Sequence, residues 1–201
     1  MREPFVEFVQ TDLGPDIVLI TCGLPASCKT GIAETAQKLK GYPIISTDRV
    51  RMEVLKGEDI FDEKIASDME KRQKVYDEVF RRADETAAKG AGIIIDATFA
   101  TQSLRRRAAQ IAAKHNRPLV IAQTICPQES SLLRIARRTR ESGDSNAITE
   151  KAYFSNKAEF EEVDLNNLKQ LHPNLDILHV TIDTQYDFPE NWYVIGRNKN
   201  H

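Results

Sequence analysis

Short β-branched segments alternate with longer stretches of helix-forming residues along most of this chain. Strands that alternate with helices favour parallel strands joined by right-handed crossovers. The segments predicted as strands are Ile17–Cys22, Tyr42–Ser46, Gly92–Asp96, Pro118–Thr124 and Asp176–Ile182. The segments predicted as helices are Lys29–Lys40, roughly Ser67–Lys89, Thr101–His115 and Pro127–Arg140. The alternation therefore predicts an α/β sandwich, in which ligands bind at the carboxyl ends of the strands.

Composition narrows the class of protein. The chain has 201 residues, of which 41% are hydrophobic and 29% charged, so we expect a single domain over residues 1–201 with its core at about 15–183. With 28 basic and 30 acidic residues, the net charge of −2 disfavours a nucleic-acid coat protein. The apolar runs are too short to span a membrane, Met1–Gln10 has no signal core, and three cysteines make no disulfide framework. We expect a cytoplasmic protein without a membrane partner, and the sequence leaves the oligomeric state open. Asp183–Trp192 is predicted to be a polar, turn-rich tail that folds back on the domain.

The residues after the first predicted strand match most of a phosphate-binding loop. In the pattern G-x-x-x-x-G-K-S/T, Gly23, Lys29 and Thr30 match, and Cys28 stands at the second glycine. Such a partial match occurs by chance in about a tenth of chains this size, so the strand before it and the helix after it carry the prediction. Backbone N–H groups of this turn would bind phosphates. The predicted loop residues are Gly23, Pro25, Ala26, Ser27, Cys28, Lys29 and Thr30.

Within this loop, Lys29 would contact the β- and γ-phosphates, and the Thr30 hydroxyl would contact Mg²⁺. The alternative is a plain turn with an exposed Lys29 and a helix-capping Thr30. Cys28 places a Cβ where glycine would let the backbone approach the phosphates. It is either tolerated with weaker nucleotide binding, or it marks a degenerate or redox-sensitive loop, since a helix N-terminus activates a thiol.

Polar residues also follow the second and third predicted strands. Asp48 can accept a proton from an attacking hydroxyl, and Arg51 on the same helical face can hold an anionic group. Asp48 as a helix cap is an equally weighted alternative. Asp96 is placed to contact Mg²⁺, and Thr98 to contact the γ-phosphate region. Capping of the next helix is the alternative for both Asp96 and Thr98.

A cluster of arginines lies on the helix predicted at Pro127–Arg140. Three of them share one helical face, a fourth follows, and a polar loop at Glu141–Asn146 leads to a return helix at Ala147–Glu162. This arrangement predicts a lid at about residues 134–150, although a solvated helix face is the alternative. The arginines are Arg134, Arg137, Arg138 and Arg140. A second cluster, Arg105–Arg107, is predicted to be solvated surface.

These motifs together resemble the P-loop kinases related to polynucleotide 5′-hydroxyl kinase and the zeta-toxin type. The resemblance rests on Gly23–Thr30, Ser46–Arg51, Ile95–Phe99 and Arg134–Asn146, and it covers roughly residues 15–183. It implies a five-stranded parallel sheet with helices on both faces and a lid. It also implies transfer of the ATP γ-phosphoryl group to a hydroxyl, with Mg²⁺ bound.

The resemblance also implies roles for single residues. Lys29 and Thr30 would lie on ATP and Mg²⁺, Asp48 would be the general base, and Arg51 would contact a phosphate of the acceptor. The lid arginine would be one of Arg137, Arg138 and Arg140, with Arg138 taken as catalytic. The acceptor is open between a small molecule and a nucleic-acid 5′-hydroxyl. The alternative function is a catalytically impaired nucleotide-binding or regulatory module, because Cys28 replaces the glycine.

Overall fold

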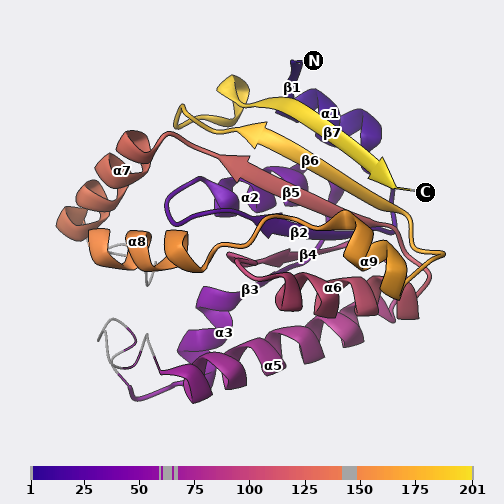
Figure 1. Cartoon of the computed structure of the whole chain (residues 1–201), viewed down its shortest axis with the longest axis horizontal. Coiled ribbons are helices and arrows are strands. Elements are labelled where there is room, and N and C mark those ends of the chain that lie inside the picture. The colour runs from indigo at the N-terminus through magenta and orange to yellow at the C-terminus, as the bar shows by residue number, and fades with distance from the viewer. Residues whose placement is uncertain (1, 59, 61–64, 66–67, 142–148, 201) are drawn as a thin grey trace.

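A seven-stranded sheet runs through the molecule, and helices pack on both of its faces (Figure 1). The structure is a computed structural model that describes residues 2–58, 60, 65, 68–141 and 149–200. The strands lie in the order β1-β7-β6-β5-β2-β4-β3. Their bounds are β1 (Glu3–Pro4), β2 (Val18–Cys22), β3 (Ile44–Ser46), β4 (Ile93–Asp96), β5 (Leu119–Ile125), β6 (Ile177–Asp183) and β7 (Tyr193–Asn200).

The five predicted strands are confirmed as β2 to β6, and their pairings with one another are all parallel. The prediction of a five-stranded sheet is wrong, because β7 pairs antiparallel with β6, and β1 pairs antiparallel with β7. The tail does fold back as predicted, since Trp192 is buried. It then continues as a strand, Tyr193–Asn200, whose second half is polar and so gave no strand signal in the sequence.

Two layers of helices cover the sheet (Figure 1). Buried residues of α5, α6 and α9 pack on one face of the sheet, and those of α1 and α2 pack on the other. The helices are α1 (Phe5–Asp12), α2 (Lys29–Lys40), α3 (Thr47–Val54), α5 (Met69–Ala87), α6 (Gln102–Lys114), α7 (Gln128–Glu141), α8 (Glu150–Glu159) and α9 (Leu165–Leu171), with a 3₁₀ turn η1 (Pro189–Asn191). Among the described helices, none is long and apolar enough to cross a membrane.

The central strands are buried on both faces, which explains their continuous apolar sequence. In β2, Val18 and Ile20 point toward the α5–α6 side, whereas Leu19 points toward α1 and α2. All five residues of β2 are buried. This central position fixes where the chain after Cys22 emerges, at the carboxyl edge of the sheet on the side of α7 (Figure 1).

Arg105 is not solvated surface, so that prediction is wrong for this residue. Its side chain is fully buried, and its guanidinium donates to the carbonyls of Glu162 at 2.9 Å and Glu161 at 2.7 Å. It shares an apolar stripe of α6 with Ala108 and Ala112, at helical spacing. The buried arginine therefore holds the chain after α8 against α6, and the small residues of that stripe were the available sequence signal.

Candidate phosphate-binding site

Three strand ends meet at one edge of the sheet. The loop of residues 23–28 follows β2, α3 follows β3, and Asp96 ends β4, while β4 lies between β2 and β3. Ser46 is the register partner of Asp96. The parallel topology thus brings the three predicted motifs together, as expected for parallel strands.

The loop after β2 has a backbone that only particular residues can adopt. Gly23 has a φ of +144°, and a Cβ there would lie 2.2 Å from the Thr124 hydroxyl oxygen. The amide of Gly23 donates to the carbonyl of Thr98 at 3.1 Å, and the Ser27 and Thr124 hydroxyls lie 2.6 Å apart. The loop is therefore packed against β5, through a residue, Thr124, that the sequence motif does not include.

Cys28 has a left-handed backbone, with φ of 61° and ψ of 25°, at the N-cap of α2. Left-handed geometry costs a non-glycine residue roughly 1–2 kcal/mol because its Cβ approaches the following carbonyl oxygen. A glycine at this position of the usual pattern would therefore adopt the left-handed backbone without strain, and it would also let a ligand approach the backbone closely. Since Cys28 occupies the N-cap, Thr30 does not cap the helix, and that alternative is wrong.

Thr30 and Asp96 form the polar centre of the site. The Thr30 hydroxyl donates to Oδ2 of Asp96 at 2.9 Å, and the Thr21 hydroxyl lies 2.9 Å from Oδ1. The amide of Ala97 donates to the Thr21 oxygen at 3.1 Å, so this strand residue fixes the carboxylate. Asp96 is 6% exposed, and the N-cap of α6 is Thr101, so Asp96 does not cap that helix. A hydroxyl and a carboxylate oxygen at this spacing fit the oxygen ligands that Mg²⁺ prefers.

Lys29 and Thr98 border this centre. The Lys29 ammonium donates to the carbonyl of Leu24 at 2.7 Å, so the side chain folds back over its own loop. Thr98 lies in the loop after β4, partly buried, with its carbonyl bound to the amide of Gly23. Both predicted residues are thus at the loop, while their contacts to a nucleotide remain predictions.

Asp48 and Arg51 lie one turn apart on α3. The N-cap of α3 is Ser46, so Asp48 sits in the first helical turn and the capping alternative is wrong. Burial lowers the pKa of Arg51, an effect that the nearby Asp48 carboxylate opposes. The Nε of Arg51 is buried and has no hydrogen-bond partner among the residues that the structure describes.

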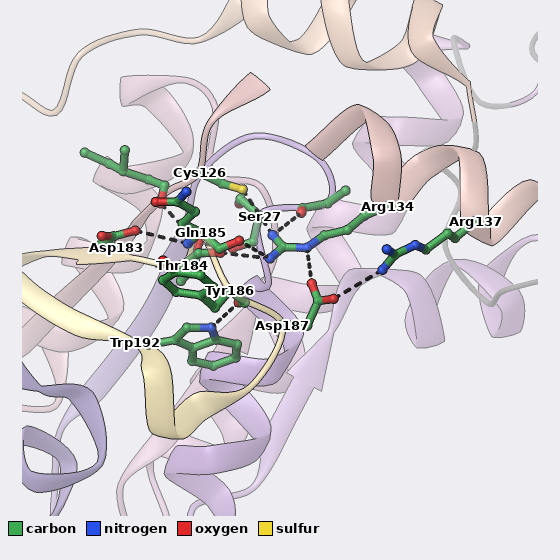
Figure 2. Close-up of polar contacts among 12 residues, drawn as sticks. Ser27, Cys126, Arg134, Arg137, Asp183, Thr184, Gln185, Tyr186, Asp187 and Trp192 are labelled. Atoms are coloured by element: carbon green, nitrogen blue, oxygen red, sulfur yellow. Dashed lines mark hydrogen bonds and ion pairs between the residues drawn. The ribbon is translucent and has the colours of Figure 1, made fainter. Parts of the chain in front are cut away.

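Arg134 on α7 is a structural clamp at the side of the loop (Figure 2). Its guanidinium donates to the Asp187 carboxylate at 2.7 Å and to the carbonyls of Thr184 and Gln185 at 3.0 Å each. It also donates to the carbonyl of Ala26 in the phosphate-binding loop at 3.2 Å. Arg134 therefore joins three segments, and sequence reasoning gave no signal for its partners in the chain after β6.

Of the other arginines of α7, the structure describes the side chain of Arg137 but not those of Arg138 and Arg140. The Arg137 guanidinium donates to the second oxygen of Asp187 at 3.2 Å, and its side chain is 65% exposed. The Arg134 guanidinium lowers the pKa of Asp187, which stays ionised as the partner of both arginines. Arg138 and Arg140 belong to α7, but their side chains lie outside the described residues, as do residues 142–148 of the predicted lid.

Comparisons with known proteins bear on the family and the fold of the chain. A family model described as an AAA domain matches residues 18–163. No protein with a curated description matches the sequence.

Several of the similar solved structures are described as kinases. One, provisionally described as a kinase from Chloroflexus aurantiacus, has a TM-score of 0.65 at 15% identity and covers 87% of each chain. A sugar kinase from a Janibacter species has a TM-score of 0.61 at 16% identity, covering 88% of this chain and 89% of its own. A gluconokinase from Sinorhizobium meliloti has a TM-score of 0.58 at 14% identity, covering 86% and 85%. At these identities the likeness is one of fold.

Proposed function

The chain belongs to the AAA domain family, and on that premise we propose that it is an ATP- and Mg²⁺-dependent kinase that phosphorylates a hydroxyl group. The observation that carries the proposal is the 2.9 Å contact between Thr30 and Asp96 beside the phosphate-binding loop. The kinase fold of the similar structures supports nucleotide-dependent phosphoryl transfer. It does not favour the alternative of a catalytically impaired module.

The loop residues would bind the nucleotide. Lys29 would leave the Leu24 carbonyl and pair with the β- and γ-phosphates, while the loop amides bind their oxygens. Thr30 and Asp96 would hold Mg²⁺, which supplies neutralisation of charge on the phosphates when bound. Catalysis in this reaction is mostly positioning and charge stabilisation, and the rigid support of Asp96 by Thr21 suits that task.

Asp48 would accept the proton of the attacking hydroxyl. Its place in the first turn of α3, beside the strand that pairs with β4, puts it on the same sheet edge as the Thr30–Asp96 pair. Arg51 and Thr98 would contact the acceptor from α3 and from the loop after β4. Arg138 as the lid arginine, with Arg137 and Arg140 on the nucleotide, stays part of the proposal.

The test is ADP release in the presence of ATP, Mg²⁺ and a library of sugars, nucleosides and 5′-hydroxyl oligonucleotides. Sugars come first, since two similar structures are a sugar kinase and a gluconokinase. Lys29→Ala and Asp48→Asn should each lower acceptor-dependent turnover by at least about a hundredfold. Arg81→Ala, on the outer side of α5, is the matched control and should keep full turnover.

Turnover that is indifferent to both substitutions would contradict the proposal. If an oligonucleotide is the acceptor, its affinity should fall steeply with salt, because counterions are released from a polyanion on binding. A small acceptor should show a shallow salt dependence. The same assay, repeated at two salt concentrations, therefore separates the two acceptor classes.

A further inference from the structure

Cys28 and Cys126 follow two segments that are packed against each other, although they lie far apart in the sequence. The fully buried Thr184 hydroxyl lies 3.0 Å from the carbonyl oxygen of Ser27 and 3.2 Å from that of Ile125 (Figure 2). These two carbonyls belong to the peptide bonds that lead into the two cysteines. A single hydroxyl therefore bridges the backbone on the amino side of both cysteines.

The guanidinium of Arg134 forms a second bridge between the same two segments. Its Nη1 donates to the Cys126 sulfur at 3.1 Å and to the carbonyl of Ala26, two residues before Cys28, at 3.2 Å (Figure 2). Burial lowers the pKa of Arg134, but the hydrogen bond to Asp187 and the negative charge of both cysteines when ionised outweigh burial and raise it. Both sulfur atoms are therefore within electrostatic reach of one guanidinium.

Cys28 and Cys126 are also the cysteines that solvent can reach. Both are partly exposed, whereas Cys22 is fully buried and its sulfur lies 3.6 Å from the carbonyl oxygen of Phe99. A thiolate, not a thiol, attacks an oxidant, and a guanidinium that donates to the sulfur stabilises the charge of the thiolate. Exposure and the Arg134 contact together favour Cys126 as the first sulfur to be oxidised.

We propose that Cys28 and Cys126 are a redox pair, in which hydrogen peroxide oxidises Cys126 beside Arg134 and Cys28 then closes a disulfide. In the first step the Cys126 thiolate attacks the peroxide, so that an S–O bond forms, the O–O bond breaks and hydroxide leaves a sulfenic acid. In the second step the Cys28 thiolate attacks this sulfur, so that the S–S bond forms and a second hydroxide leaves. The hydroxides take up the two thiol protons. Two thiols are thus oxidised, and one peroxide is reduced to two waters.

The disulfide would change the shape of the phosphate-binding loop. Strand β5, which ends just before Cys126, is held between β2 and β6, whereas Cys28 has a left-handed backbone whose strain is relieved when the loop moves. The disulfide would also weaken the hydrogen bond from Arg134 to the Cys126 sulfur. Since Cys28 directly precedes Lys29, we expect the oxidised loop to bind phosphates poorly. This consequence for ATP rests on the proposed function, but formation of the disulfide does not.

The disulfide is tested by treating the reduced wild type with hydrogen peroxide, blocking the remaining thiols and mapping the peptides by mass spectrometry. We expect one cross-linked pair, which contains Cys28 and Cys126 and lacks the two thiol hydrogens, while Cys22 stays reduced. Cys28→Ser should instead leave Cys126 as a sulfenic acid that a dimedone probe labels. Arg134→Ala should slow the oxidation of Cys126 about tenfold. Arg137→Ala, which removes another partner of the same carboxylate, is the matched control and should react as the wild type does.

Peroxide treatment that leaves Cys28 and Cys126 unlinked, or that links either of them to Cys22, would overturn the proposal. Equal oxidation rates in Arg134→Ala and Arg137→Ala would overturn the role of Arg134. Arg134→Lys replaces the alanine variant if that variant does not fold. Lysine lacks the planar fork that binds the loop, the sulfur and the carboxylate together, so this variant should still react more slowly than the wild type.

The link to nucleotide binding is tested by calorimetric titration of the reduced and the oxidised protein with ATP. The affinity should fall at least about tenfold on oxidation and return when dithiothreitol reduces the disulfide. Cys126→Ser should bind ATP as the wild type does and keep that affinity after peroxide treatment. An undiminished affinity in the disulfide form would refute the link while leaving the proposed function standing. If the reduced wild type does not bind ATP, the proposed function is refuted, and the peptide map decides the redox pair by itself.

Discussion

Cys28 carries a left-handed backbone at the one position of the loop where the phosphate-binding pattern has a second glycine. Two separate effects therefore meet in this residue. Its Cβ strains the backbone of the loop itself, and we expect it also to weaken phosphate binding, because the pattern has a glycine without a Cβ at this position. The two effects can be measured apart.

Cys28→Gly should raise the free energy of unfolding by about 1 kcal/mol, because glycine adopts the left-handed conformation without strain. It should also tighten ATP binding, since the Cβ is gone. Cys28→Ala is the matched control, which removes the thiol and keeps the Cβ. Chemical denaturation and calorimetric titration with ATP give the two quantities. If the glycine and alanine variants agree in both, the backbone account of Cys28 is wrong.

At this scale, sequence reasoning found residues that belong to a motif and missed those that support them. Thr30 and Asp96 were both predicted at the metal, and they lie in hydrogen-bond contact. Thr21 and Thr124 were not found, because a threonine inside a buried strand gives the same pattern whether its hydroxyl supports a carboxylate or not. Only the register of β2 against β4 and β5 brings those hydroxyls to the loop.

At the scale of single elements, α7 shows that a periodic pattern can predict a helix and its faces but not what each side chain on a face contacts. The spacing of Arg134, Arg137 and Arg138 predicts a shared helical face, which is correct for a helix at Gln128–Glu141. The pattern does not distinguish an arginine facing a phosphate from one that clamps a loop. Arg134 is 11% exposed and donates to carbonyls of two other segments, the phosphate-binding loop and the chain after β6, because that chain folds against it.

Removing the Arg134 clamp should loosen the phosphate-binding loop from its support. Arg134→Ala leaves the carbonyls of Ala26, Thr184 and Gln185 without this donor, so we expect a loss of about 2 kcal/mol in the free energy of unfolding. The matched comparison is Arg137→Ala, whose 65% exposed side chain should contribute less than about 0.5 kcal/mol. Urea unfolding measures both. Equal losses in the two variants would show that Arg134 is not a clamp.

At the scale of the whole molecule, the alternating segments predicted the parallel strands β2 to β6. They did not predict the two antiparallel strands, β7 and β1, at one side of the sheet. The strands β2 to β6 are apolar because helices cover both of their faces. The strand β7, which lies between β1 and β6, carries Gly196 and the polar run Arg197–Asn200, so its pairing with β6 left no periodic signal. One domain over residues 1–201 with a lid at about 134–150 remains a prediction.

The stability of the molecule should depend on pH through His179 of β6. Its imidazole is 8% exposed and hydrogen-bonds Gln123, and burial lowers its pKa to about 4, helped by the nearby Arg105 charge. In the unfolded chain the same imidazole takes up its proton at about pH 6.5. The contribution of neutral His179 to the free energy of unfolding is therefore complete above that pH and is lost as the pH falls toward 4. The total is up to about 3 kcal/mol. Urea unfolding of the wild type and His179→Gln between pH 4.5 and 7.5 should show a steeper acid loss in the wild type. Parallel profiles would refute this account.

The central claim, that this sheet edge binds ATP together with Mg²⁺, is tested most directly by measuring ATP affinity with Mg²⁺ and with EDTA. In the wild type, Mg²⁺ should tighten ATP binding at least about tenfold, because Thr30 and Asp96 hold the metal against the phosphates. Asp96→Asn should retain ATP binding in EDTA and lose most of the gain from Mg²⁺. An ATP affinity that does not depend on Mg²⁺ in the wild type, or a gain that survives intact in Asp96→Asn, would contradict the account.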